Sequence, residues 1–148
     1  MNLKEKINTD LKEAMRAKDK IRLSTVRSIR ALILEYEKSG KNEELSADDE
    51  IKMLTSAAKK RKESIEQYEK AGRTDLLEQE KAELEIIKSY LPEQLSDAEI
   101  KKEVEKIAKE IGAASKSDFP KLMPLAIKAL KGKADGKQIR KSVEEILS

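Results

Sequence analysis

The sequence contains no cysteine, no histidine and no tryptophan. Without cysteine the chain has neither a thiolate nucleophile nor a disulfide, which suits a reducing compartment. Without histidine it has no imidazole base, no Ser-His-Asp triad and no ordinary zinc site. These absences remove several reaction classes at once, so we predict no catalytic residue, no metal site and no cofactor.

Aromatic residues and long apolar runs are also scarce. Aromatic residues make up 3% of the chain, whereas β-strands favour aromatic and β-branched residues. No window reaches the roughly 18 consecutive apolar residues of a membrane-spanning helix, and the charged first residues do not resemble a signal peptide. We therefore expect an all-α protein in the cytoplasm, with no membrane partner.

Charged residues, by contrast, make up 41% of the 148 residues. Lys, Glu, Ala, Leu and Ile dominate, and these residues enter helices at little entropic cost. Disorder is disfavoured because apolar residues recur at helical spacing, in stripes that include Met15 of the first helix and Ile111 of the fifth. The same composition is typical of a thermophile's protein or of a redesigned sequence, and the sequence does not separate these two origins.

Capping residues and helix breakers predict seven helices in two domains. Asp19 can cap the second helix, and Ser96 begins a Ser-x-x-Glu capping box. Pro92 ends the fourth helix because the residue before a proline is pushed out of the helical region. We predict a four-helix N-terminal domain over residues 1–91 and a small three-helix C-terminal domain over residues 96–148.

Three blocks of sequence resemble a known family. They are KKRKESIEQYEKAGRTDL at 59–76, YLPEQLS at 90–96 and KGKADG at 131–136. One block alone carries little information, but all three in this order and spacing are similar to the GatB/YqeY family along essentially the whole chain. The resemblance implies a helical domain followed by a GatB/YqeY-type three-helix domain. In GatB, the similar module is the C-terminal part of a tRNA-dependent amidotransferase subunit and helps to hold tRNA, while amidation belongs to the rest of that enzyme.

One segment departs from the family pattern. After Asp118 the family usually has Met-Gly-Lys-Val-Met, with a Met-Pro pair some residues later, whereas this chain has FPKLMP at 119–124. Pro120 suits a first helical turn, but Pro124 would remove a hydrogen bond inside an established helix. We therefore expect the sixth helix either to start later than the family pattern suggests or to kink.

Basic residues gather in two segments. The loop before the last helix combines glycines, mobile lysines and a helix N-terminus, a combination that favours phosphate, although a plain helix connector with solvated lysines would use the same residues. The predicted RNA-binding residues are Lys131, Gly132, Lys133, Gly136, Lys137, Arg140 and Lys141. A secondary basic patch comprises Arg16, Lys20, Arg27 and Arg30, although such a helix face is more often solvated and ion-paired.

These patterns favour a non-catalytic accessory module that binds RNA, with tRNA first by the family resemblance. Shape and phosphate contacts would provide the binding, because the chain lacks the aromatic residues that stack on splayed bases. The alternative is a protein-interaction module that docks on an amidotransferase, a synthetase or another partner in aminoacyl-tRNA metabolism. A carbon–nitrogen ligase that takes its amide nitrogen from glutamine is less favoured, because no nucleophile–base set is present.

Overall fold

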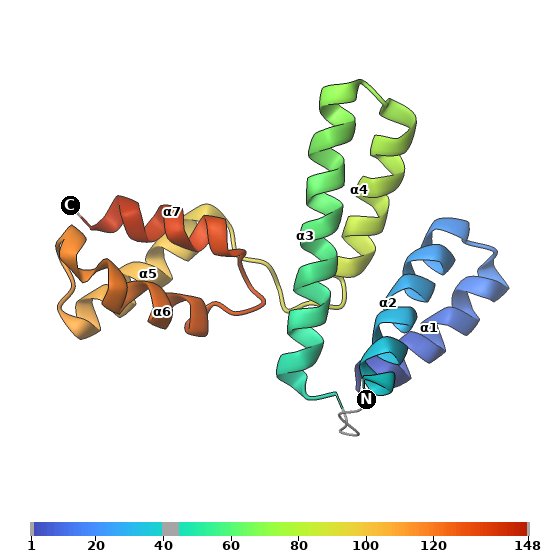
Figure 1. The fold of residues 1–148 in the computed structure, drawn as a ribbon, viewed down its shortest axis with the longest axis horizontal. Helices are drawn as coiled ribbons and strands as arrows, with labels where there is room; N and C mark the ends of the chain where they lie inside the picture. The colour runs from blue at the N-terminus through green and yellow to red at the C-terminus, as the bar shows by residue number, and fades with distance from the viewer. Residues whose placement is uncertain (1, 40–44, 148) are drawn as a thin grey trace. The chain divides into compact units, whose positions relative to one another are not determined.

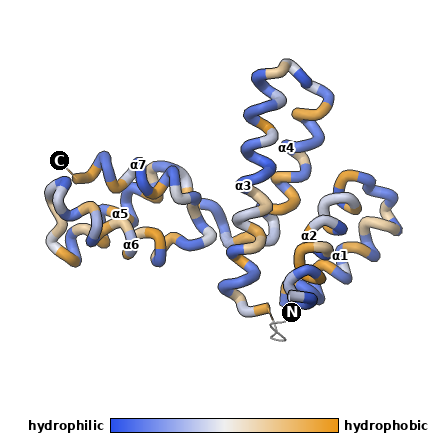
Figure 2. Tube along the Cα trace, in the orientation of Figure 1, coloured by the Kyte–Doolittle hydropathy of each residue, from blue (hydrophilic) through white to orange (hydrophobic). Residues whose placement is uncertain are grey.

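The computed structural model describes residues 2–39 and 45–147. Over these residues the protein contains seven α-helices and no strand, which confirms the predicted all-α fold class. Residue contacts divide the chain into two compact units, Met1–Leu91 and Pro92–Ser148. Figure 2 shows apolar positions recurring along each helix, separated by polar ones. No helix in the described ranges is long and apolar enough to cross a membrane.

The first unit consists of two helical hairpins, shown in blue to green in Figure 1. Its helices are α1 (Leu3–Ala17), α2 (Lys20–Lys38), α3 (Ala47–Ala71) and α4 (Thr74–Lys88). Helix α1 packs on α2, and α3 packs on α4, while α2 also contacts α4 and thereby joins the hairpins. Their shared core consists of Leu3, Ile7, Val26, Ile29, Ile33, Leu54, Ala58, Leu84 and Ile87.

Local hydrogen bonds explain where these helices begin and end. The carboxylate of Asp19 accepts the N–H of Arg22 at 3.1 Å and so caps α2, as predicted. Helix α3 ends at Gly72, whose φ of +68° lies in the left-handed region that glycine tolerates. Gly40, at which the sequence pattern ends the second helix, lies outside the described residues. Met15 was expected on the buried face of α1 but is 54% exposed, so that prediction was wrong.

The second unit contains three helices around a smaller core. They are α5 (Asp97–Ile111), α6 (Phe119–Ala129) and α7 (Gly136–Ile146), and a short 3-10 turn (Lys116–Asp118) precedes α6. Helix α7 packs on both α5 and α6. The core is formed by Ile100, Val104, Ala108, Leu122, Ala126, Leu130, Ala134, Ile139, Val143 and Leu147. The predicted capping box at Ser96 is present, but Ile111, expected in the core, is 41% exposed.

Helix α6 does not start late. It begins at Phe119, with Pro120 in its first turn and Pro124 in its interior. The carboxylate of Asp118 accepts the N–H groups of Ala114 and Ser115 at 2.9 and 3.1 Å, which fixes the chain just before the helix. Because Pro124 has no N–H, α6 lacks one internal hydrogen bond, a defect that costs about 3 kcal/mol in an isolated helix. Leu122 and Ala126 of the helix, and Leu130 directly after it, are buried in the core, and burial of apolar side chains favours the folded helix.

Candidate nucleic-acid interface

The loop between α6 and α7 contains the predicted binding residues and is a tight turn. Gly132 has a φ of +79°, which an L-amino acid with a side chain adopts only at a cost. The N–H groups of Lys133 and Ala134 both donate to the carbonyl of Leu130, at 2.9 and 3.2 Å. The glycine at 132 is therefore required by the backbone of the turn, independently of any ligand.

The segment before α5 holds this turn from one side. The Nε2 group of Gln94 donates to the carbonyl of Gly132 at 2.6 Å, and the N–H of Leu95 donates to the carbonyl of Lys133 at 2.9 Å. Both contacts lie within the second unit. Backbone carbonyls of the turn are thus already bound inside the unit, so the turn can offer a ligand only its side chains and other backbone groups.

The N-terminus of α7 is partly occupied by its own cap. The carboxylate of Asp135 accepts the N–H of Gln138 at 2.9 Å, and the side chain of Gln138 accepts the N–H of Asp135 at 3.2 Å. This capping box begins α7. Gly136 remains open to approach, because a Cβ atom added there would meet nothing within 4 Å. An anion at this helix end would therefore contact the lysines and the backbone near Gly136 rather than Gln138.

Cations line the outer face of α7. Lys137, Arg140 and Lys141 are exposed and lie three and four residues apart, opposite the buried residues Ile139 and Val143. Arg140 Nε is 3.0 Å from Glu144 Oε1, an exposed ion pair that offsets part of its charge. Lys133 is exposed before the helix, whereas the neighbouring Lys131 is half-buried.

The first turns of the seven helices described above differ in whether they contain an acidic residue. Acidic residues stand in the first turns of α1, α3, α4 and α5, where they complement the positive end of the helix dipole. The first turns of α2, α6 and α7 contain none. Instead they carry Lys20, Lys121 and Lys137 respectively. Each such cation costs about 0.3–1 kcal/mol of helix stability before its attraction to the aspartate at the N-cap is counted, and these aspartates are Asp19, Asp118 and Asp135.

The secondary basic patch lies on the first hairpin. Arg16 is in the last turn of α1, where a cation is favoured by the helix dipole. Lys20 begins α2, and Arg27 follows seven residues later on the same helix face. Arg30, three residues after Arg27, is a further exposed cation, and all four residues are exposed. The structure therefore spreads this patch over the end of α1 and along α2 and shows no loop at which the four side chains converge.

A surface depression lies beside the outer face of α7. Lys116, Phe119, Arg140, Glu144 and Leu147 line an open depression of about 520 Å³ in the second unit. Its two cations are accompanied by Glu144, which already pairs with Arg140. Among residues 2–39 and 45–147, no three Asp, Glu, His or Cys side chains gather as a metal site.

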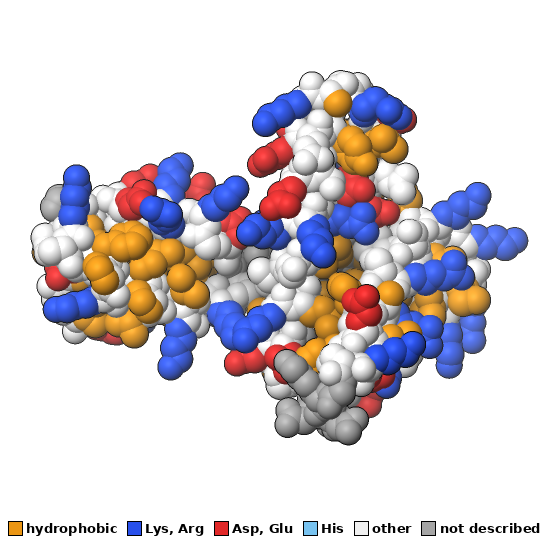
Figure 3. Space-filling view, viewed as in Figure 1, with side chains coloured by type: hydrophobic (Ala, Val, Ile, Leu, Met, Phe, Trp, Pro, Cys, Tyr) orange, Lys and Arg blue, Asp and Glu red, His pale blue; other side chains and the backbone are white. Residues whose placement is uncertain are grey.

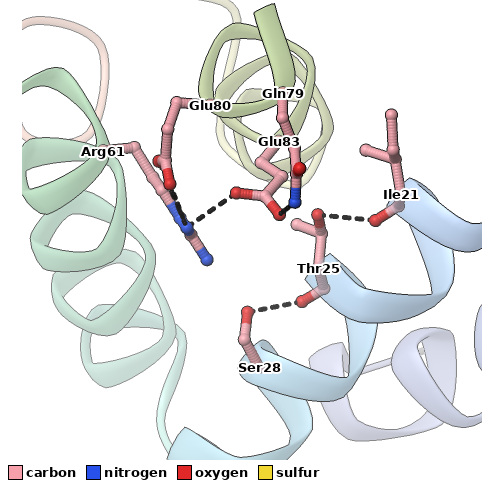
Figure 4. Close-up of polar contacts among 7 residues, drawn as sticks. All are labelled: Ile21, Thr25, Ser28, Arg61, Gln79, Glu80 and Glu83. Carbon is pink, nitrogen blue, oxygen red and sulfur yellow. Dashed lines mark hydrogen bonds and ion pairs between the residues drawn. The ribbon is translucent and has the colours of Figure 1, made fainter. Parts of the chain in front are cut away.

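Sequence reasoning missed a polar cluster in the first unit, shown in Figure 4. Arg61 of α3 reaches two carboxylates of α4: its Nη1 lies 2.7 Å from Glu83 and 3.2 Å from Glu80. Gln79 Nε2 donates to Glu83 at 3.4 Å. In the sequence Arg61 stands within four consecutive basic residues, and nothing local distinguishes it from its neighbours. Only the packing of α3 on α4 identifies Arg61 as the residue that turns inward.

Comparison with known proteins identifies the family. The chain matches a family model described as Yqey-like protein over residues 4–147. The chain belongs to the YqeY-like family. This result confirms the family predicted from the three sequence blocks.

Two curated relatives of the YqeY-like chain are proteins named altered inheritance of mitochondria protein 41, mitochondrial. That of Pyrenophora tritici-repentis is 31% identical over 96% of this chain and 79% of its own length. That of Lachancea thermotolerans is 36% identical over 75% of this chain and 60% of its own length. The chain thus spans less than two thirds of the second relative. Because these relatives are named mitochondrial, the predicted cytoplasmic location was wrong.

Proposed function

We propose that this YqeY-like protein is a module without a reaction of its own that binds structured RNA, tRNA first, through the phosphate backbone. The observation that carries the proposal is the outer face of α7. There Lys137, Arg140 and Lys141 follow a helix N-terminus that has no acidic residue in its first turn. Apart from the Asp135 carboxylate that caps the helix, this arrangement concentrates positive charge where a phosphate would meet it.

The mode of binding follows from the groups at this face. Lys133, Lys137 and Lys141 would neutralise phosphates and release condensed counterions, which makes the affinity depend steeply on salt. Lysine acts as a mobile point charge, so such contacts recognise the course of the phosphates rather than a base sequence. The open backbone at Gly136 lets a phosphate approach the start of the helix.

Two of the three tyrosines of the first unit, Tyr36 and Tyr90, donate their hydroxyls to carboxylates within the unit. The hydroxyl of Tyr36 donates to Asp49 at 3.0 Å, and that of Tyr90 donates to Asp10. Burial and the carboxylate of Asp10 raise the pKa of Tyr90. Neither ring is arranged as an exposed stacking platform for single-stranded bases, which favours a folded RNA as the ligand.

A titration of tRNA across a salt series tests the proposal. We expect the variant Lys133→Ala/Lys137→Ala/Lys141→Ala to bind more weakly. The slope of log affinity against log salt should fall by roughly 0.7–0.9 for each phosphate that the variant no longer neutralises. Lys131 is left unchanged because it is half-buried in the turn.

The matched control removes the same charge from another helix of the same unit. Lys102, Lys106 and Lys109 are exposed on α5, so Lys102→Ala/Lys106→Ala/Lys109→Ala changes net charge equally. The control should retain most of the affinity and slope. Equal decreases in the two variants would mean that binding follows net charge alone, and no decrease in either would remove the α7 face as the RNA site.

A further inference from the structure

Helix α6 exposes apolar side chains that do not take part in the core of the second unit. Leu122, Ala126 and Leu130 already fill the core side of the helix. Leu125 and Ile127 point elsewhere and are 42% and 45% exposed. Figure 3 shows hydrophobic side chains gathered over this helix, with lysine and arginine at the edges. Contiguous exposed apolar surface of this kind marks an interaction site more often than a scattered single residue does.

The exposed residues form two adjacent strips along α6. Pro120, Pro124 and Ile127 recur at helical spacing and form the first strip. Lys121, Leu125 and Lys128 repeat the same spacing and form the second. The helix sequence FPKLMPLAIKA contains two lysines and no acidic residue. The helix itself thus holds no acidic residue beside these lysines, although Asp118 directly precedes it and lies close enough to Lys121 for the two charges to attract.

Several features of α6 reduce the stability of the helix, and they coincide on this surface. The interior proline removes a backbone hydrogen bond, a lysine stands in the first turn, and two large apolar residues face outward. When several preferences for helix stability are violated at one surface, this indicates a functional constraint on that surface. The constraint is separate from the RNA face proposed above, which lies on α7.

We propose that this face of α6 is the docking site of an acidic amphipathic helix from a partner protein. The partner would place leucine-like side chains at i, i+3, i+4 and i+7 against Pro124, Leu125 and Ile127, the spacing by which amphipathic helices present their apolar face. Glutamate or aspartate beside that stripe would meet Lys121 and Lys128, whose charge sets the sign of the partner.

The chemistry of the strip disfavours other occupants. Lys121 and Lys128 attract phosphates, but Leu125 and Ile127 offer a phosphate no donor and a base no aromatic ring, so RNA would leave the apolar part of this surface unused. A helix that lies in a lipid interface inserts its main apolar face. In α6 that face is buried in the protein core, and only the narrow strip remains outside.

A synthetic probe tests the proposal on the whole chain. The probe is a fluorescein-labelled peptide of about 18 residues, or five helical turns, with leucine at the stripe positions and glutamate beside them. Anisotropy should show saturable binding that Leu125→Ser/Ile127→Ser weakens roughly tenfold or more, because the peptide then meets two hydroxyls in place of two apolar side chains. The matched control Met15→Ser/Ile21→Ser replaces two exposed apolar residues of the first unit and should leave the affinity unchanged.

Charge reversal provides the second arm. Lys121→Glu/Lys128→Glu should weaken the glutamate-flanked peptide and strengthen a peptide in which lysine replaces glutamate. A peptide of the same composition with its stripe scrambled should not bind. Equal binding of the scrambled peptide, or indifference to charge reversal, would overturn the proposal. Two further results would overturn it. If the protein self-associates in sedimentation and Leu125→Ser/Ile127→Ser abolishes this, the occupant is a second copy of the chain. If the protein binds phosphatidylserine-containing vesicles and the same variant abolishes this, the occupant is a lipid surface.

Discussion

Arg61 Nη1 lies 2.7 Å from the Glu83 carboxylate, and Glu83 is 3% exposed. The contact links the middle of α3 to α4, and Glu80 adds a second carboxylate on the same guanidinium. Burying a carboxylate costs several kcal/mol unless a cation pairs with it. The pair is therefore a requirement of the folded first unit, and its members cannot be changed singly without destabilising that unit.

Arg61→Ala should lower the free energy of unfolding by about 2–4 kcal/mol, because it leaves the charge of Glu83 buried without its cation. The double change Arg61→Met/Glu83→Leu should cost less, since it removes both charges together. Urea unfolding followed by circular dichroism measures both. Arg73→Ala is the control, because Arg73 pairs with Asp75 at the surface and both side chains are more than half exposed. A destabilisation no larger for Arg61→Ala than for Arg73→Ala would contradict the structural importance of the pair.

Two glycines of the α6–α7 region should respond in opposite ways to alanine. Gly132→Ala should lower the free energy of unfolding by about 1–2 kcal/mol, because residue 132 has a φ of +79°. Gly136→Ala should leave it unchanged or raise it by up to about 1 kcal/mol, because the site is open and helical. Thermal unfolding of the two variants beside the parent protein measures the difference. Similar behaviour of both variants would show that the turn at Gly132 differs from the one described.

The short segment before α5 should fold together with the C-terminal unit. A fragment of residues 92–148 retains the bonds of Gln94 and Leu95 to the α6–α7 turn and the cap at Ser96. A fragment of residues 97–148 has none of them and should be less stable by about 2–4 kcal/mol. Thermal unfolding followed by circular dichroism compares the two fragments.

If both fragments are too unstable to compare, Gln94→Ala in the whole chain tests the same point. It should speed amide exchange in α7 more than in α3, because the carbonyl of Gly132 loses its donor. Equal exchange in the variant and the parent would mean that the segment contributes nothing to the C-terminal unit. The predicted boundary between the two domains, at residues 92–95, stays a prediction, and limited proteolysis is its test.

The start of α6 should weaken in acid. Hydrogen bonds from the N–H groups of Ala114 and Ser115 hold the pKa of Asp118 below its ordinary value of 3.8. A depressed pKa in the folded state means that the contribution is present above the unfolded pKa and is lost as pH falls through the folded one. Amide signals of residues 114 and 115 should therefore shift as pH falls below 3.8, and Asp118→Asn should remove that shift. Signals that titrate unchanged in Asp118→Asn would assign the effect to another group.

Much of the fold could be predicted because its signals are local. Asp19, Ser96 and Asp135 bond backbone N–H groups three residues away, so sequence spacing alone identifies them as caps. Pro124 could not be placed, because whether a helix tolerates an interior proline depends on packing elsewhere. Met15 was misjudged because periodicity gives the direction of an apolar stripe but not how far the neighbouring helix covers it.

The candidate sites were less predictable, because their contacts join distant segments. Lys137, Arg140 and Lys141 share a helix face that the 3.6-residue period implies. The bond between Gln94 and Gly132 joins residues 38 positions apart, and no local pattern announces it. The inward turn of Arg61 depends likewise on α4. Sequence can therefore identify the charges of a surface, whereas the backbone that holds them follows from tertiary packing.

The order of charges along α7 has a consequence for the kinetics of encounter. Lys137, Arg140 and Lys141 precede Glu144 and Glu145, so the side chains add to the backbone dipole instead of opposing it. Apart from the carboxylate of the Asp135 cap, the helix thus has an electric moment with its positive pole at the N-terminus. A polyanion would be rotated toward that pole before any contact forms, which raises the association rate and makes that rate fall steeply with ionic strength.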